Sequence, residues 1–104
     1  MKLSNTETIA NQTISKTLGI ARGSTVRSRN IGRDIFASLK NIVGGEIEEY
    51  TKLQADAREQ ALKRMISDAQ RLGADAVVNV RFTTSVVAQG ASEMLAYWTA
   101  VKLK

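Results

Sequence analysis

The segment from Met94 to Leu103 carries apolar side chains on both sides of an extended chain, and it constrains the fold more than any other feature. Successive side chains of a strand point to opposite faces of its sheet. The apolar residues on one side are Met94, Ala96, Trp98 and Ala100, and those on the other side are Leu95, Tyr97, Val101 and Leu103. A strand that is apolar on both faces is covered on both faces. The segment is therefore predicted to be a strand with a covering layer on each side.

Two earlier segments alternate between apolar and polar residues, and each is predicted to be a strand with one buried face. In residues 13–26, the apolar side chains on the even positions are Ile14, Leu18, Ile20 and Val26. An alternative interpretation divides this segment into two strands joined at residues 22–24, because the glycine there is typical of a bend. In residues 76–82, the side chains expected to face inward are Ala76, Val78, Val80 and Phe82.

Two segments between these strands have the spacing of helices. Asn30 is a predicted N-cap, and the apolar residues that follow at intervals of three and four are Ile31, Ile35, Leu39, Ile42 and Val43. A Gly-Gly pair ends this short helix. A longer helix is predicted to start at Glu46 or Glu48 and to end at Leu72, with Gly73 as its C-cap. Its apolar stripe consists of Leu53, Ala57, Ala61, Met65, Ala69 and Leu72.

The predicted order is strand, helix, helix, strand, strand in one domain of 104 residues, with residues 1–12 as a loose arm or a short edge strand. This order predicts an α+β fold in which helices cover one face of an antiparallel sheet of about three strands. One layer of helices cannot cover both faces of a sheet. The second face of the last strand is therefore predicted to meet a copy of the same chain, and an exposed apolar patch on a monomer is the alternative. The residues assigned to the contact between copies are Leu95, Tyr97, Trp98 and Val101.

The chain contains no Cys and no His. This composition excludes disulfides, catalytic Ser–His and Cys–His pairs, and the usual ligands of transition metals. We therefore expect no catalytic residue, no metal site and no cofactor. The first residues lack the apolar core of a signal peptide, and no apolar run approaches the about 20 residues that span a membrane. A cytoplasmic protein without a membrane partner is the resulting expectation.

Positive charge is concentrated between Lys16 and Lys40. Within this segment, Arg33 follows the predicted N-terminus of the short helix, where unpaired N–H groups attract anions. The residues predicted to bind a small anionic ligand are Asn30, Gly32, Arg33 and Asp34. The alternative is an ion pair between Asp34 and a neighbouring arginine, with the other basic side chains exposed to solvent.

The same positive charge is compatible with binding of nucleic acid, but the aromatic residues argue against it. They make up 5% of the chain, and Tyr97, Trp98 and Phe82 lie in apolar strand segments rather than among the arginines. The stacking platform of a single-strand binder is therefore not expected. Nucleic acid is disfavoured as a partner on this basis.

Three strings resemble the YbjQ-like family of small bacterial proteins. They are NIGRDIFA at 30–37, NIVGG at 41–45 and GADAVV at 73–78, and the resemblance extends over residues 13–102. It implies a β-α-β-β subunit with the outline of a dodecin subunit, assembled as a homopentameric ring. The family is uncharacterised in function and carries a label of heavy-metal binding, which a chain without Cys or His supports poorly.

These observations lead to two functional predictions. The first is a non-enzymatic homo-oligomeric ring that acts as a scaffold or binds a small anionic ligand. The alternative is a basic oligomer that binds nucleic acid or another polyanion. Binding that weakens steeply with salt would indicate the second function.

Overall fold

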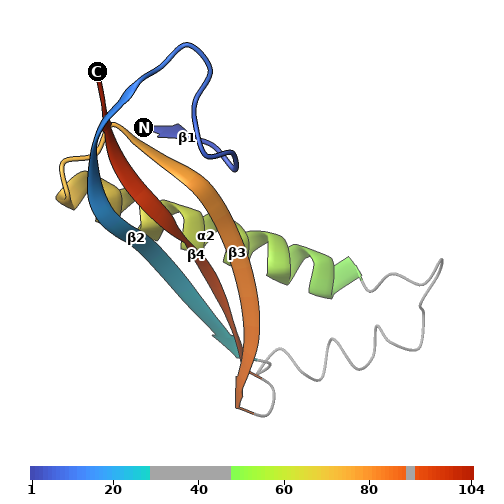
Figure 1. Ribbon diagram of the computed structural model, residues 1–104. Helices are drawn as coiled ribbons and strands as arrows, with labels where there is room; N and C mark the ends of the chain where they lie inside the picture. Colours follow the sequence, from blue (N-terminus) through green and yellow to red (C-terminus); the bar gives the residue numbers. More distant parts are fainter. Residues whose placement is uncertain (29–47, 89–90) are drawn as a thin grey trace.

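The computed structural model describes residues 1–28, 48–88 and 91–104, and its elements form two layers (Figure 1). The elements are β1 (Lys2–Leu3), β2 (Ile14–Ser28), α2 (Glu48–Arg71), β3 (Ala76–Ala88) and β4 (Ala91–Leu103). The strands form one sheet in the order β1-β3-β4-β2. β1 runs parallel to β3, and the other neighbouring strands are antiparallel. The predicted helix that starts at Asn30 lies outside the described residues.

The α+β fold predicted from the sequence is confirmed. After β1 the described elements follow the order β-α-β-β, and α2 lies on one face of the sheet, mainly against β2 and β4. β1 adds a parallel pair at one edge, so the sheet is mixed rather than antiparallel throughout. Within the described ranges, no helix is long and apolar enough to cross a membrane. We call the face opposite α2 the outer face.

α2 packs on the sheet through the apolar stripe that its sequence predicts. The most deeply buried members of this stripe are Ala57, Ala61, Met65 and Ala69. The helix ends at Arg71, and the Ala74 N–H donates to the Ala69 carbonyl oxygen at 3.0 Å. Gly73 supplies the left-handed backbone, with φ 81°, that this termination requires. The predicted glycine C-cap is therefore confirmed.

The face of β2 that packs against α2 is not the face predicted from its apolar residues but the opposite one. Beneath α2 lie small side chains such as Thr25, which is 4% exposed, whereas Ile20 and Val26 lie on the outer face and are 67% and 56% exposed. The cause is the close approach of the helix at Gly23, where a Cβ atom would lie 2.1 Å from the Met65 amide nitrogen. A helix backbone this close leaves room only for small side chains. The larger residues of β2 therefore point outward.

β2 is one continuous strand from Ile14 to Ser28. The interpretation as two strands joined at residues 22–24 is therefore wrong. The irregularities in its pairing with β4 lie earlier, where the register shifts between Ile14 and Lys16 and again between Thr17 and Gly19. Because a shift of one residue moves the following side chains to the other face, simple alternation does not hold across these points.

β3 is buried on both faces at its start and exposed at its end. Val77 belongs to the apolar cluster beneath α2, and Ala76 and Val78 belong to a second cluster on the outer face. A register shift follows Val78, where Asn79 has φ 57°, and it changes which residues face α2. Phe82 is paired with Ala96 and therefore lies on the face that carries α2, but it is 45% exposed there rather than buried.

The N-terminal segment covers one end of the outer face. Ile9 and Ile14 pack there against the cluster that contains Val101 of β4. The segment is attached to β3 by backbone hydrogen bonds, among them one from the Ser4 N–H to the Val77 carbonyl oxygen at 3.0 Å. At this end, the prediction that the second face of β4 must be covered from outside the chain is wrong. The middle of the outer face has no such layer among the described residues.

Candidate anion-binding face

Three side chains from neighbouring strands lie side by side across the middle of the outer face, and they are Arg22, Tyr97 and Arg81. Arg22 of β2 and Arg81 of β3 are each paired in register with Tyr97 of β4. Directly paired side chains share a face, with Cβ atoms about 5 Å apart. Because neighbouring strands are about 4.8 Å apart, the Cα atoms of the two arginines are about 10 Å apart across the tyrosine. We call these three residues the Arg-Tyr-Arg row.

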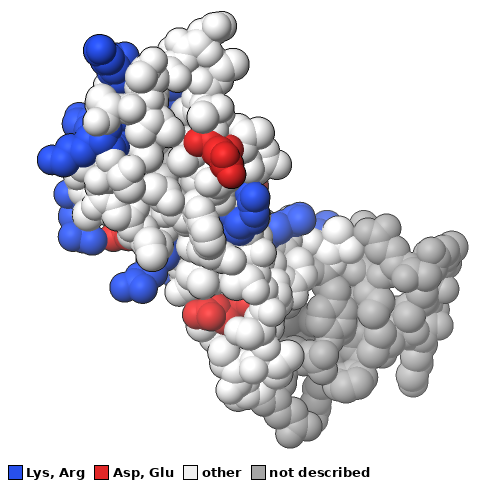
Figure 2. Space-filling view, in the orientation of Figure 1, with Lys and Arg blue, Asp and Glu red and all other residues white. Residues whose placement is uncertain are grey.

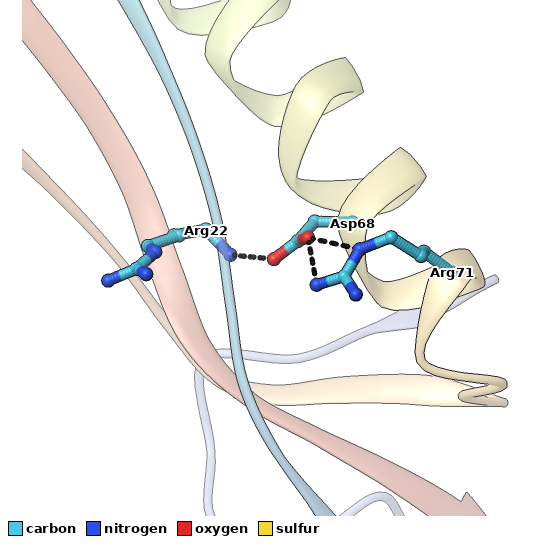
Figure 3. A network of polar contacts seen from close by, with 3 residues as sticks. All are labelled: Arg22, Asp68 and Arg71. Atoms are coloured by element: carbon cyan, nitrogen blue, oxygen red, sulfur yellow. Dashed lines mark hydrogen bonds and ion pairs between the residues drawn. The ribbon is translucent and has the colours of Figure 1, made fainter.

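The backbone of Arg22 is held by α2, whereas its side chain is not. The Arg22 N–H donates to Asp68 Oδ2 at 3.1 Å. The other oxygen of Asp68 accepts hydrogen bonds from Nε and Nη2 of Arg71, at 3.2 and 2.9 Å. Figure 3 shows the side chain of Arg22 extending away from both of these residues. Asp68 is thus engaged on the α2 side of the strand, and Arg22 presents its guanidinium to the outer face.

These hydrogen bonds hold the pKa of Asp68 below its ordinary value. The side-chain bond from Arg71 contributes most, and the backbone N–H of Arg22 contributes next. Burial acts in the opposite direction, because it disfavours the charged carboxylate, but it does not outweigh the hydrogen bonds. Asp68 is therefore ionised at neutral pH and keeps both contacts.

The guanidinium of Arg81 is anchored at one of its nitrogens. Nη1 donates to the carbonyl oxygens of Asn5, at 2.9 Å, and Val80, at 3.1 Å. Asn5 belongs to the N-terminal segment, which therefore also positions this arginine. An arginine side chain has five N–H donors in a fixed plane. Anchoring at Nη1 leaves the N–H groups of Nε and Nη2 for other partners.

Within the described part of the chain, neither arginine of the row forms an ion pair. The ion pairs there are Arg71–Asp68 and Lys102–Asp75. The acidic residue of β4 on the same face is Glu93, four residues along the strand and therefore about 13 Å from the row. Figure 2 shows positive charge along the β2 side and in the middle of the molecule, and one acidic patch lies directly beside the central basic group. The row thus brings two positive charges to this face that form no ion pair among the described residues.

The row also contains an aromatic surface. Tyr97 is half-buried, and the neighbouring Trp98 is 39% exposed. Their ring centroids are 5.1 Å apart and their planes are tilted by 53°. Arginine side chains bind oxyanions without taking part in proton transfer, because they stay protonated. The arrangement can therefore bind an anion and a planar ring together.

The residues predicted from the sequence to bind an anion lie elsewhere. Asn30, Gly32, Arg33 and Asp34 all lie outside the described residues. Of the residues predicted to contact another copy, Leu95 and Tyr97 are half-buried and Trp98 is exposed. Val101 is 1% exposed in a single chain, because the N-terminal segment covers it. Its side chain therefore has almost no surface of its own for a contact with another copy.

The Arg-Tyr-Arg row was missed by sequence reasoning. Tyr97 was placed apart from the arginines because Arg22 lies 75 residues before it in the chain and Arg81 lies on another strand. Alternation within a strand indicates only that a side chain shares a face with the residues two positions before and after it. The register between strands, which brings the three together, has no local signal in the sequence.

Asp75 connects the start of β3 to the end of β4. Its Oδ2 accepts a hydrogen bond from the Leu103 N–H at 2.9 Å, and its Oδ1 accepts one from Lys102 Nζ at 3.5 Å. The bond from Leu103 is the largest of the causes that lower the pKa of Asp75. Asp75, the residue before β3, is therefore linked to the last residues of β4.

Comparison with known proteins relates the whole chain to one family. The family model YbjQ_1, with the description "Putative heavy-metal-binding", matches residues 1–104. A UPF0145 protein of Halorubrum lacusprofundi is 58% identical over 104 residues, which is 100% of each chain. Another, of Methanosarcina acetivorans, is 55% identical over 103 residues, which is 99% of this chain and 97% of the relative. Such relatives occur in archaea as well as in bacteria such as Dehalococcoides mccartyi.

A solved structure has the same fold. It is a protein of unknown function of the DUF74 family from Pediococcus pentosaceus. It superposes with a TM-score of 0.66 at 14% sequence identity, and the match covers 100% of this chain and 98% of that one. At this identity the similarity supports the architecture of the sheet and α2.

The residues of the chain do not fit the heavy-metal ion of the family description. The sequence has no Cys and no His, and the described ranges contain no group of three or more acidic residues that could hold a metal ion. Met65 is fully buried in the core, and the sulfur of Met94 accepts a hydrogen bond from the Thr84 hydroxyl at 3.3 Å. Soft and borderline metals prefer thiolate and imidazole ligands. The described residues therefore offer no set of ligands that suits such an ion.

Proposed function

The chain belongs to the YbjQ_1 family, and we propose that it is a non-enzymatic, self-associating protein that binds anions on the outer face of its sheet. The observation that carries this proposal is the Arg-Tyr-Arg row. Both arginines lie at the surface, and among the described residues neither guanidinium group forms an ion pair with a carboxylate. Guanidinium groups bind oxyanions through two parallel hydrogen bonds, which makes two adjacent ones a site for phosphate-like groups.

Self-association is supported by the large apolar side chains that the described part of the single chain leaves exposed. Among them, Ile20 is 67% exposed and Val86 is 81% exposed. Contact with other copies would remove such apolar surface from water.

The proposed contact between copies lies at the far end of β3. Phe82, Val86 and Val87 are 45%, 81% and 53% exposed there, and we call them the hairpin patch. They are left uncovered because α2 packs mainly on β2 and β4 and makes few contacts with β3. The half-buried Leu95 and Tyr97 offer less surface, so the hairpin patch replaces them in this proposal. A closed ring of five copies, as the family resemblance implies, would present several Arg-Tyr-Arg rows on one assembly.

Titration with pyrophosphate tests the anion-binding part of the proposal. The wild-type protein should bind the probe, and Arg22→Gln combined with Arg81→Gln should weaken binding about tenfold or more, because two charge-assisted contacts are lost. Arg58→Gln is the matched control, since Arg58 is an exposed arginine of α2. Equal binding by the double variant and the control would contradict the proposal.

A further inference from the structure

We propose that the anion is the phosphate backbone of a single-stranded nucleic acid, with one base stacked on Tyr97 between Arg22 and Arg81. This inference rests on the proposed anion-binding function and names its ligand. The sequence argued against such a ligand because the aromatic residues were expected to lie apart from the arginines. The strand register removes that objection, since Tyr97 is paired directly with both arginines.

The combination of ring and charge is what single-strand binders use. Such proteins combine positive groups that follow the backbone with aromatic side chains on which successive bases stack. Tyr97 supplies the ring, and Trp98 extends the aromatic surface, with its ring centroid 5.1 Å from that of Tyr97. An inorganic anion would use the two arginines and gain nothing from the rings. A ligand with both phosphates and bases uses every part of the row.

The spacing of the row favours a strand over a free nucleotide. The two arginines lie on the strands on either side of Tyr97, with their Cα atoms about 10 Å apart. Within a polynucleotide, each nucleoside is flanked by a phosphate on both sides. A base that stacks on Tyr97 can therefore place one phosphate near Arg22 and the next near Arg81. A mononucleotide has phosphate on one side only and would leave one arginine without a partner.

The structure favours a single strand over a duplex. A duplex keeps its bases stacked on one another, so they cannot stack on a protein side chain. Reading a duplex through its major groove requires a helix or ribbon with a row of basic residues. The exposed side of α2 mixes both signs, for example Glu59 beside Lys63 and Asp56 near Lys52. The described helix is therefore a poor groove reader, and the open sheet face is the better surface.

Fluorescence anisotropy with a labelled oligothymidylate of about 12 nucleotides tests the inference, since such a length spans the site of one small domain. The competitors are inorganic polyphosphate, thymidine monophosphate and the duplex of the same oligonucleotide with oligodeoxyadenylate. The oligothymidylate should bind more tightly than each competitor. Replacing both Arg22 and Arg81 by Gln should lower the slope of log affinity against log salt by about 1.4, at about 0.7 per phosphate contact.

Variants of Tyr97 separate stacking from simple attraction between charges. Tyr97→Leu should weaken binding of the oligothymidylate by about 5- to 100-fold, which is the usual effect of removing one stacking ring. It should leave binding of polyphosphate unchanged, and Tyr97→Phe should bind both ligands like the wild type. Arg58→Gln should bind like the wild type as well.

Each outcome decides between the inference and the function on which it rests. If polyphosphate or the duplex binds as tightly as the single strand, or if Tyr97→Leu loses no affinity for it, the inference is wrong and anion binding stands. If neither polyphosphate nor the oligonucleotide binds at low salt, both proposals are wrong. Should Tyr97→Leu fail to fold, the comparison of the three polyanions on the wild-type protein still gives the answer.

Discussion

Asp68 accepts a hydrogen bond from the backbone N–H of Arg22, at 3.1 Å, rather than from its guanidinium. β2 is an edge strand of the sheet, so its N–H and C=O groups that point away from β4 have no strand to pair with among the described residues. A second of these groups, the Ser24 carbonyl oxygen, accepts a hydrogen bond from Nη1 of Arg64 in α2 at 2.7 Å. Side chains of α2 thus close part of an edge that would otherwise pair with another strand. Because Asp68 binds the backbone of Arg22, the guanidinium group of Arg22 is not held by Asp68 and extends to the outer face.

Asp68→Ala is expected to destabilise the fold. The change removes the partner of the Arg22 N–H and of the Arg71 guanidinium. Hydrogen bonds to charged groups contribute about 1.5–3 kcal/mol each at most, so we expect a loss of about 2 kcal/mol in the free energy of unfolding. Urea denaturation measures it. Asp56→Ala, at an exposed position of the same helix, is the control and should change stability by less than about 0.5 kcal/mol.

Stability should fall in acid because the pKa values of Asp68 and Asp75 are lowered in the folded chain. An aspartate in an unfolded chain titrates near about 3.9. A lowered folded pKa means that the folded state resists protonation more than the unfolded state does. Each group therefore stabilises the folded state at pH values above its pKa in the unfolded chain. This stabilisation is lost as the pH falls from there through the pKa of the folded state.

Chemical denaturation at a series of pH values, from neutral to below about 3, measures this loss. In the Asp68→Asn variant, the contribution of this residue is already absent. The free energy of unfolding should therefore fall less steeply in acid than it does for the wild type. Curves of identical steepness would show that the contacts of Asp68 do not stabilise the folded state.

Gly23→Ala should be among the most damaging single substitutions of the sheet. An added Cβ would lie 2.1 Å from the Met65 amide nitrogen and 2.5 Å from the Ala61 carbonyl oxygen, and both atoms belong to the helix backbone. α2 must therefore move off β2, which we expect to cost about 3 kcal/mol. Ser24→Ala, one residue along and on the other face, should be nearly neutral. A thermal unfolding midpoint unchanged in Gly23→Ala would show that the layers pack less closely.

Val86→Glu should weaken self-association if copies meet through the hairpin patch. A buried carboxylate without a partner is costly at an interface, so the molar mass from light scattering should fall toward that of one chain. Val26→Glu is a matched control, because Val26 is 56% exposed but lies on the outer face, away from the patch. A loss of mass in Val26→Glu alone would place the contact between copies on the outer face instead.

The local elements of the fold could be predicted because their signals are local. The stripe through Ala57, Ala61, Met65 and Ala69 and the C-cap at Gly73 follow from the spacing of residues along one helix. The face of β2 could not be predicted in the same way. That face depends on how closely α2 approaches Gly23, although α2 starts 25 residues later in the chain. Because the approach is close, the larger apolar residues of β2 point away from α2.

The candidate site depended on information that no single segment contains. Composition did indicate a basic protein that binds anions, but it directed attention to residues 30–34. The row on the outer face requires two pairings, Arg22 with Tyr97 and Arg81 with Tyr97, and each is set by strand register. The pairing of β3 with β4 also includes a shift of register between Val78 and Arg81. Without that shift Arg81 would not lie opposite Tyr97.

The central claim is that anions bind at the Arg-Tyr-Arg row. Nuclear magnetic resonance of the arginine side-chain Nε–H groups, followed during titration with oligothymidylate, tests it most directly. We expect the signals of Arg22 and Arg81 to move together and to saturate at the same ligand concentration as the Tyr97 ring signals. Signals that move at Arg33 while those of Arg22, Arg81 and Tyr97 stay unchanged would contradict the account.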